Sequence, residues 1–440
     1  MLTINKRGRG FLKDGAPFFW LGDTAWLMFA KLNDAEIEAY LSNRAAKGFT
    51  VIQATLSHFE NYASWDGCPA FLNNELATPA EDSPYWERVD RTIHMASRLG
   101  LVMALLPCWG SFAKTGLLNE GNAPAYGAFL ARRFGGYENL LWLLGGDVRG
   151  SDAPATFEAL ARALRRGAPN QLIGFHPFGR CSSSQWFAGA DWLDFHMFQS
   201  GHRDRSQRRL NAWDDNEVSD EEWMAEESYL YVFRDLKRDN KPTLDGEPSY
   251  EEIPHGLHDA SKPYWTDRQV RRYAWWDLLA GAAGFTYGHN AIMQFWRGTE
   301  EGSFGVRQTW DVAMHAPGSF QMRNLRRLME ALDWQAGNNA QEYLADDSGK
   351  EDERNLCFAS PAGLAVYSYS GAPFGVKLDK LPYRPLAYWY SPKLGGLSPF
   401  MLPGDGCFTP PADTPEALED WVLVLLDPKQ ADAVARALRE

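Results

Sequence analysis

Residues 139–147 read Asn-Leu-Leu-Trp-Leu-Leu-Gly-Gly-Asp. The apolar run at 140–144 is short and is followed by two glycines, a pattern typical of a buried β-strand that ends in a turn. Amphipathic segments lie on both sides of it, at 124–134 and at 156–166. Strands that alternate with helices predict parallel pairing, because each helix carries the chain back to the start of the next strand.

The same strand and helix alternation continues through residues 17 to about 335. Apolar runs predict strands at 18–22, 50–56, 101–107, 139–144, 171–175, 192–198, 242–244 and 284–287. Helices are predicted after Asn33, after Ser83-Pro84, and at 124–134, 156–166, 220–239, 267–280 and 320–332. Eight such units favour a (β/α)8 barrel over a doubly wound sheet, and the sequence has no GxGxxG or P-loop motif.

The last hundred residues have a different pattern. Short β-type runs separated by Gly, Pro and Ser turns lie at 356–359, 364–369, 386–390 and 421–426. They predict a small antiparallel β-sandwich. We therefore expect a barrel domain at 1–338 and a β-sandwich domain at 339–440, with Val366, Trp389 and Val422 buried where the two dock.

Composition narrows the functional classes. The chain has 440 residues, 45% hydrophobic and 23% charged, which is typical of a globular protein. The net charge of −13 argues against a nucleic-acid partner or an anionic membrane. The 18 tryptophans serve a large core, a sugar-stacking cleft, or both.

Cysteines and the N-terminus bear on the cellular compartment. The five cysteines are scattered without CxxC spacing, which excludes a zinc ribbon or a disulfide scaffold as a main theme. Residues 1–15 contain no apolar run of the kind a signal peptide has. We expect a cytoplasmic protein; a secreted chain whose signal was removed is the alternative.

Polar and aromatic side chains follow nearly every predicted strand. In (β/α)8 barrels the active site is built at the carboxyl ends of the strands. The residues at these positions are Asp23, His58, Cys108, Trp109, Asp147, His176, His196, Gln199, Asp245, Glu247, Tyr287, His289 and Asn290. A barrel with a purely structural role has no need of this pattern.

Two of these residues form a candidate catalytic pair. Asp147 follows the fourth strand and Glu247 the seventh, so the two face each other across the barrel mouth. Glycoside hydrolysis needs two carboxyl groups on opposite sides of the scissile bond. The alternative roles are a helix N-cap for Asp147 and a rim salt bridge for Glu247. Asp245 is the rival carboxylate on the seventh strand, but it should lie deeper.

The remaining residues are candidates for sugar binding. Asp23 could accept hydrogen bonds from sugar hydroxyls or cap a helix, and the histidines could donate and accept such bonds. The candidate binding residues are Asp23, Trp26, His58, Trp109, His176, His196, Gln199, Tyr287, His289 and Trp296. The sequence contains neither HExxH nor GxSxG, and an isolated HxxH at 255–258 is a weak signal, so we expect neither a metal nor another cofactor.

Three of these motifs carry a family resemblance. Residues 19–26 (Phe-Trp-Leu-Gly-Asp-Thr-Ala-Trp), 140–147 and 242–248 (Pro-Thr-Leu-Asp-Gly-Glu-Pro) resemble the apiosidase-like glycoside hydrolases, family 140 and its relatives. The resemblance covers the barrel. It implies a retaining mechanism, with Asp147 as acid/base and Glu247 as nucleophile, and a C-terminal β-sandwich once named for collagen binding. Many members are secreted, and the lack of a signal here departs from that pattern.

The sequence thus predicts a retaining, exo-acting glycosidase. It would release a terminal residue, with a furanoside such as apiose as one candidate, from an oligosaccharide or glycoconjugate. The two carboxyl groups should then lie about 5–5.5 Å apart. The alternative is a non-catalytic carbohydrate- or protein-binding protein on a barrel scaffold.

Overall fold

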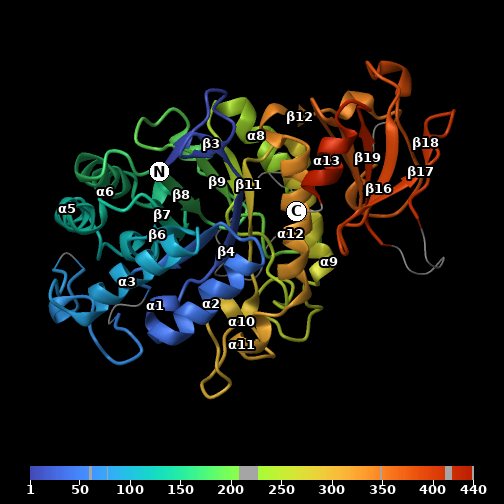
Figure 1. The fold of residues 1–440 in the computed structure, drawn as a ribbon. Helices are drawn as coiled ribbons and strands as arrows, with labels where there is room; N and C mark the ends of the chain where they lie inside the picture. Colours follow the sequence, from blue (N-terminus) through green and yellow to red (C-terminus); the bar gives the residue numbers. More distant parts are fainter. Residues whose placement is uncertain (59–61, 77, 208–225, 347–348, 412–418, 439–440) are drawn as a thin grey trace.

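The computed structural model describes residues 1–58, 62–76, 78–207, 226–346, 349–411 and 419–438. It contains a barrel and, beside it, a smaller β-rich part (Figure 1). No helix in these ranges is both long enough and apolar enough to cross a bilayer.

Eight parallel strands form a nearly closed barrel, which confirms the predicted fold class. Their spatial order is β8-β7-β6-β5-β4-β11-β10-β9, and a bond from Asp194 N to Ile173 O (2.8 Å) links the segments at the two ends of this order. The strands are β4 (Trp20–Thr24), β5 (Val51–Thr55), β6 (Val102–Leu106), β7 (Leu140–Val148), β8 (Ile173–Pro177), β9 (His196–Phe198), β10 (Thr243–Asp245) and β11 (Gly284–Tyr287). Because every buried strand faces both the barrel interior and the helix layer, most of their residues are apolar.

Helices surround the barrel, and two of them begin at the predicted caps. Asn33 forms a capping box with Glu36, and Ser83 accepts a bond from Tyr85 N. Thr266, which was not predicted as a cap, forms a second capping box. The main helices are α2 (Asp34–Ala46), α3 (Pro84–Arg98), α5 (Ala123–Phe134), α6 (Pro154–Gly167), α8 (Tyr229–Arg238), α9 (Asp267–Ala280) and α12 (Pro317–Ala331).

Two elements are shorter than predicted. Strand β9 begins at His196, because residues 192–195 turn and Asp194 there accepts bonds from Ile173 N and Arg165. Helix α8 begins at Tyr229, whereas a helix was expected from 220; residues 220–225 lie outside the described ranges.

Short elements complete the barrel part. Strands β1 (Leu2–Ile4), β2 (Phe11–Lys13) and β3 (Ala16–Phe18) form a separate three-stranded sheet at the N-terminus. Single-turn helices are α1 (Met28–Lys31), α4 (Ser111–Lys114), α7 (Ser184–Phe187), α10 (Asn290–Met293) and α11 (Trp310–Ala313). The 3-10 turns are η1 (Leu72–Asn74), η2 (Gly150–Asp152), η3 (Trp334–Ala336), η4 (Gln341–Tyr343), η5 (Glu351–Glu353) and η6 (Leu378–Lys380).

The C-terminal part is antiparallel, as predicted. One sheet has the order β12-β13-β14-β19-β16-β17, and β15 pairs with β18 in a second, small sheet. The bounds are β12 (Asn338–Asn339), β13 (Asn355–Ser360), β14 (Gly363–Ser368), β15 (Phe374–Gly375), β16 (Leu386–Tyr390), β17 (Leu397–Phe400), β18 (Cys407–Phe408) and β19 (Trp421–Leu426), followed by α13 (Ala431–Ala437).

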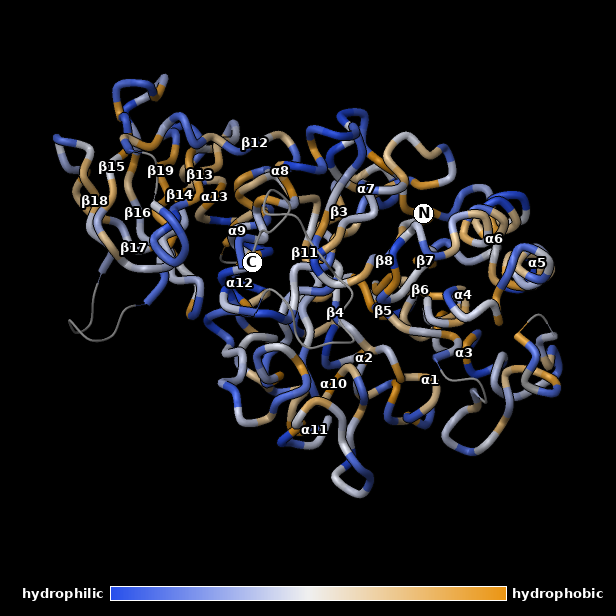
Figure 2. Tube along the Cα trace, turned by 180° about the vertical axis from the view of Figure 1, so that it is seen from behind, coloured by the Kyte–Doolittle hydropathy of each residue, from blue (hydrophilic) through white to orange (hydrophobic). Residues whose placement is uncertain are grey.

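The large sheet packs against α9 and α12 of the barrel (Figure 1). Tyr367 stacks on Trp275 of α9, with ring centroids 5.7 Å apart, and Tyr390 bonds to Asn324 O of α12. In the chain coloured by hydropathy, strands of this part are largely apolar (Figure 2).

The docking face differs in part from the prediction. Val422 packs with the core shared with the barrel, whereas Val366 and Trp389 pack on the opposite face of the sheet, in a separate apolar cluster. Successive residues of a strand point to opposite faces, and here both faces are apolar, so the sequence pattern does not identify the face that docks.

Candidate active site

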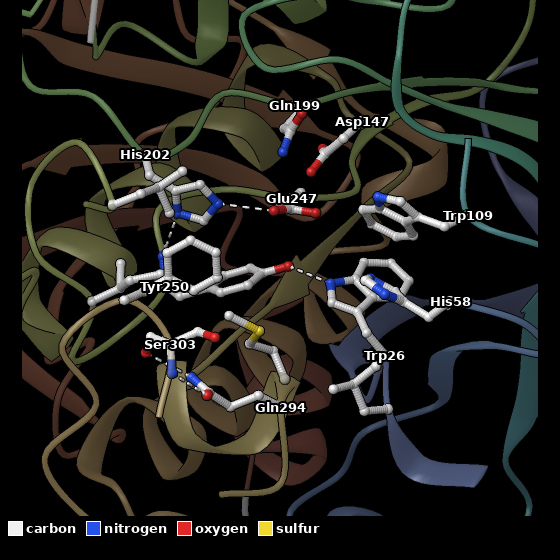
Figure 3. Close-up of a pocket in the computed structure, with 15 residues that line it drawn as sticks. Trp26, His58, Trp109, Asp147, Gln199, His202, Glu247, Tyr250, Gln294 and Ser303 are labelled. Atoms are coloured by element: carbon white, nitrogen blue, oxygen red, sulfur yellow. Dashed lines mark hydrogen bonds and ion pairs between the residues drawn. The ribbon is translucent and has the colours of Figure 1, made fainter. Parts of the chain in front are cut away.

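A cavity of about 290 Å³ opens at the carboxyl ends of the barrel strands (Figure 3). It is lined by residues that follow seven of the eight strands. Its described lining is Trp26, Leu27, His58, Trp109, Asp147, Gln199, His202, Glu247, Tyr250, Ile253, Leu257, Met293, Gln294, Ser303 and Phe304. Both predicted carboxylates are among them, together with Trp26, His58, Trp109 and Gln199.

Asp147 is aimed at the cavity by an irregular end of β7. The pairing of β7 with β8 shifts register between Gly145 and Val148, and Gly145, Gly146 and Asp147 all have positive φ, of 83°, 108° and 51°. A Cβ at Gly145 would lie 2.3 Å from His176 O, and one at Gly146 would lie 2.8 Å from the Trp109 ring. Only glycine fits both positions, so the Gly-Gly pair is what permits the turn that presents Asp147.

Glu247 follows β10 and is held from two sides. Nε2 of His202 lies 2.8 Å from its Oε1, and Nε2 of His176 lies 3.1 Å from its Oε2. Nδ1 of His202 accepts a bond from Tyr250 N (3.4 Å), so Nε2 carries the proton and donates to the carboxylate. Glu247 N donates to Oδ1 of Asp245 (3.1 Å), which fixes the backbone of the turn.

The pKa values of the two carboxyl groups are shifted in opposite directions. Burial raises the pKa of Asp147 to about 7, with a further contribution from the negative charge of Glu247. Burial would also raise the pKa of Glu247, but hydrogen bonds from His176 and His202 outweigh it and lower the pKa to about 2. Near neutral pH, Glu247 is therefore ionised while Asp147 retains a large protonated fraction, a division typical of acid and nucleophile pairs.

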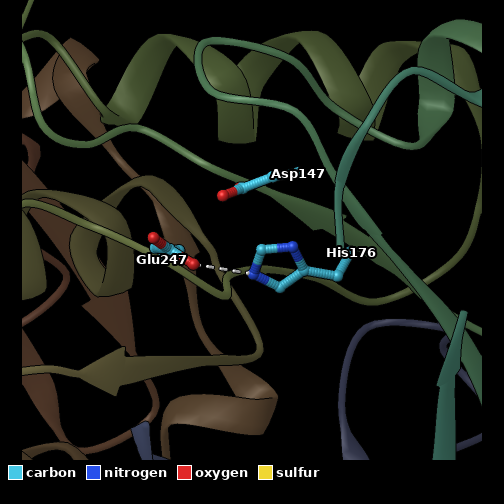
Figure 4. Close-up of side chains that lie close together, drawn as sticks. All are labelled: Asp147, His176 and Glu247. Atoms are coloured by element: carbon cyan, nitrogen blue, oxygen red, sulfur yellow. Dashed lines mark ion pairs between the residues drawn. The ribbon is translucent and has the colours of Figure 1, made fainter. Parts of the chain in front are cut away.

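Asp147, His176 and Glu247 form a compact cluster (Figure 4), each offering an atom within 4.8 Å of the others. Burial alone would lower the pKa of His176, but Glu247 and Asp147 raise it overall. Two carboxylates and an imidazole are also a ligand set that a divalent cation could use. In the present geometry both imidazoles already contact Glu247, since Nε2 of His202 donates to Oε1 and Nε2 of His176 lies 3.1 Å from Oε2.

Aromatic side chains wall the cavity. Trp109 lies 4.8 Å from the His58 ring and 5.4 Å from the Trp26 ring, centroid to centroid. Burial lowers the pKa of His58 to about 4, so its imidazole is neutral at physiological pH and can both donate and accept. Trp26 Nε1 donates to Tyr250 Oη (3.0 Å), which fixes the edge of this wall (Figure 3).

Sequence reasoning missed His202 and Tyr250. Neither directly follows an apolar run; His202 lies in the loop after β9 and Tyr250 in the loop after β10. Their proximity to the Gln199 and Glu247 strand ends was the one available signal, and it does not specify which loop side chain turns inward.

Three of the predicted sugar-binding residues face away from the cavity, which corrects those expectations. Asp23 is fully buried and binds Tyr40 and Arg44 of α2. Tyr287 is buried with its hydroxyl 2.6 Å from Oε2 of Glu251. These side chains point outward into the helix layer, because alternate residues of a barrel strand face the helices. His289 caps α10 through Nδ1, which accepts from Ala291 N (3.1 Å).

Three further residues have other surroundings than expected. His196 opens β9, at the far end of the strand from the cavity, and contacts Ser183 and Asp239. The indole of Trp296 donates to Glu300 O (2.8 Å) outside the cavity lining. His176 is fully buried behind Glu247, so it can support that carboxylate but not contact a sugar directly. Asp245 lies beneath Glu247, as the sequence suggested.

Comparisons with known proteins extend this description. The family model described as "Apiosidase-like, catalytic domain" matches residues 5–336, and that described as "Putative collagen-binding domain of a collagenase" matches residues 339–426. No curated protein matches the sequence.

Solved structures also resemble the chain. One described as "Glycoside hydrolase" is 35% identical over 97% of both chains, with a TM-score of 0.89. A glycoside hydrolase family 5 protein from Bacteroides vulgatus ATCC 8482 is 34% identical over 97% of this chain and 94% of its own, also with a TM-score of 0.89. An endo-1,4-β-D-mannanase from Thermotoga petrophila, 15% identical over 71% of this chain and 100% of its own, shares the fold with a TM-score of 0.50.

Proposed function

Because this chain belongs to the apiosidase-like family of glycoside hydrolases, we propose that it is a retaining, exo-acting glycosidase with Glu247 as nucleophile and Asp147 as acid/base. The observation that carries the proposal is that the pKa values of two adjacent carboxyl groups are shifted in opposite directions. The pKa of Glu247 is about 2 and that of Asp147 about 7. Atoms of the two groups lie within 4.8 Å, which favours direct attack over the wider spacing that admits a water.

In the first step, an oxygen of Glu247 attacks the anomeric carbon while Asp147 gives its proton to the glycosidic oxygen. The bond between the anomeric carbon and that oxygen breaks, and the aglycone leaves as a neutral alcohol. His202 and His176 hold the carboxylate in place, so little reorganisation is needed during attack.

In the second step, Asp147 acts as a base. Once Glu247 is an ester its negative charge is gone, so one of the two causes that raise the pKa of Asp147 disappears. Asp147 can then accept a proton from a water that attacks the anomeric carbon from the vacated side. Two inversions at that carbon give net retention, and Glu247 is released as a carboxylate.

The cavity supports removal of a single terminal residue. The cavity of about 290 Å³ bounded by Trp26, Met293 and Phe304 has room for one sugar ring. A neighbouring cavity of about 380 Å³ shares Asp147, Gln199 and His202 with it and has room for the leaving group. Trp109 and the neutral His58 supply an apolar face and hydrogen-bonding atoms, the combination that sugar rings require. A furanoside such as apiose is within the proposed class.

The test is hydrolysis of a panel of aryl glycosides, with the product anomer followed by ¹H NMR before mutarotation. Glu247→Ala should lose turnover of every substrate, because no other group forms the covalent intermediate. Asp147→Ala should retain the first step only with an activated leaving group, and azide should restore its turnover with retained configuration.

Asp82→Ala, an exposed aspartate outside the cavity, is the matched control and should behave as wild type. First-formed product of inverted configuration from the unmodified enzyme would refute the retaining mechanism. Undiminished hydrolysis of an unactivated glycoside by either alanine variant would remove that residue from the mechanism.

A further inference from the structure

A second cavity, larger than the first, lies at the opposite end of the barrel. Its volume is about 740 Å³, and it is bounded by the β1–β2 turn, the end of α8, the end of α9 and the first strands of the C-terminal part. Residues 240 and 280–282 of its lining directly precede β10 and β11, which places it at the amino ends of the strands, away from Asp147 and Glu247. Figures 1 and 2 both show α8 beside β12 at this edge.

The charge of this cavity is opposite to that of the whole chain. Its lining includes Arg7, Arg9 and Lys237, and none of its described residues is an aspartate or a glutamate. The chain has 57 acidic and 44 basic residues, so a lining with three cations and no acid has the opposite sign of charge to the chain as a whole. Burial lowers the pKa of Arg9, and the charge of Arg7 lowers it further, as expected where cations lack a counter-ion.

Two of the three cations have no partner within the described chain. Arg7 donates to Gln335 O (2.6 Å) and to Asn338 Oδ1 (2.9 Å). The guanidinium of Arg9 and the ammonium of Lys237 make no hydrogen bond or ion pair with any residue in the described ranges. Both are therefore available to an anionic ligand.

The turn that carries Arg9 is held rigidly. A Cβ at Gly8 would lie 2.5 Å from Asn240 O, and one at Gly10 would lie 2.9 Å from the Gln335 side chain. Close approach to the backbone of Asn240 and to the side chain of Gln335, together with the bond from Arg9 N to Asn5 Oδ1 (3.1 Å), restricts the position from which Arg9 extends. A preformed site loses less entropy on binding than a mobile one.

Capping of the nearby helix ends explains only part of this charge. The last carbonyls of α9 are already satisfied, since Gly281 N donates to Leu278 O (3.1 Å) and Asn339 Nδ2 to Leu279 O (3.0 Å). Lys237 lies in the last turn of α8 and complements its dipole, but Arg9 belongs to a different segment and caps no helix.

We propose that this cavity is a second carbohydrate site, one that binds an acidic saccharide through Arg9 and Lys237. Apolar side chains of Phe233, Leu236 and Trp334 also line it, and they offer a surface for the ring faces of a sugar. Two cations in a lining that also has such a surface suit a ring that carries a carboxylate or a sulfate. The site would hold an acidic glycan remote from the reacting bond.

The test is calorimetric titration of the full-length protein with a hexuronate trisaccharide. The comparison probes are the same trisaccharide reduced to its neutral form, a sulfated trisaccharide and inorganic phosphate. Arg9→Gln and Lys237→Gln should each weaken hexuronate binding by about fivefold, and the double variant by about twentyfold, because each removes one charge-assisted contact in a partly exposed site. Binding should also weaken with added salt.

Arg98→Gln, an exposed arginine on α3 outside the cavity, is the matched control. Glu247→Gln should bind the hexuronate as the wild type does, and the double variant should hydrolyse an aryl glycoside normally. A failure of the binding proposal can therefore be distinguished from a failure of the proposed catalysis. The indole NMR signal of Trp334, assigned with Trp334→Phe, should move on binding, which provides a readout even if an arginine variant folds poorly.

Several results would overturn the assignment. Equal binding of the neutral trisaccharide would exclude recognition of charge. Phosphate binding as tight as that of the saccharides would reduce the cavity to a simple anion site. A double variant that binds as well as Arg98→Gln, or no binding by the wild type, would show that no acidic saccharide occupies it. A sulfated probe that binds more tightly than the hexuronate would support the site and name sulfate as the anionic group.

Discussion

Replacing Glu247 with glutamine should lower the pKa of Asp147, because it removes the neighbouring negative charge without changing shape. The two carboxyl groups offer atoms within 4.8 Å of each other. At that distance, and with an effective dielectric constant of about 20, Coulomb's law gives about 3.5 kcal/mol, which would lower the pKa by about 2.5.

One feature of the site reduces this value. Burial, the larger cause of the raised pKa, is unchanged by the substitution, so it neither adds to nor subtracts from the change. Glu247 also raises the pKa of His176, and the positive charge on that imidazole lowers the pKa of Asp147. Loss of the imidazolium would act in the opposite direction, so we expect a net decrease of about 1 to 2, from about 7 toward 5 or 6.

The assay is a ¹³C NMR titration of aspartate-labelled protein, in wild type and in Glu247→Gln. The signal is assigned by its absence in Asp147→Asn. In the wild type, kcat/KM for an unactivated glycoside should fall above pH 7 as Asp147 loses its proton, whereas below that pH Asp147 remains protonated. An Asp147 pKa that changes by less than about 0.5 between the two proteins would refute the electrostatic coupling of the pair, and with it the explanation of its switch from acid to base.

Three other predictions follow from the site and its surroundings. His202→Phe removes one of the two hydrogen bonds that lower the pKa of Glu247, so the acid limb of the kcat/KM profile should move up by about 1 to 2 pH units while the alkaline limb stays; an unmoved acid limb would exclude His202 as a determinant. Asp23→Asn leaves Arg44 buried without its carboxylate partner and should lower the free energy of unfolding by about 3–5 kcal/mol, measured by thermal or denaturant unfolding, with KM unchanged. A raised KM with normal stability would instead show that Asp23 contributes to sugar binding. Dialysis against EDTA should leave kcat unchanged, because the carboxylate pair completes the proposed reaction; loss of activity that a divalent cation restores would instead make Asp147, His176 and Glu247 a metal site.

The barrel and several residues that line the cavity at its mouth could be predicted from the chain alone, because both depend on local patterns. Apolar runs of three to seven residues between amphipathic segments determine strands and helices, and caps such as Asn33 and Ser83 determine where helices begin. Parallel strands bring their carboxyl ends to one face, so a polar residue after such a run is placed at the mouth without any long-range information. This reasoning located Asp147 and Glu247 at the cavity. Their chemical roles remain predictions.

The direction of each side chain at the mouth was decided only by the tertiary structure. Asp23 and Asp147 both end apolar runs, yet Asp23 points outward to Arg44, while the register shift after Gly145 turns Asp147 inward. A strand presents alternate residues to opposite sides, so one residue of register decides between the helix layer and the cavity.

Residues in the loops also depended on the tertiary structure. His202 and Tyr250 reach the cavity through loops whose paths are set by packing against other strands, and no local pattern encodes that. For the same reason the sequence predicted a docked β-sandwich but not its docking face: both faces of β14 and β19 are apolar, and only contact with α9 distinguishes them. Local periodicity thus determined which elements form, whereas contacts between distant segments determined which side chains meet, because those contacts depend on register and packing that no short window of sequence contains.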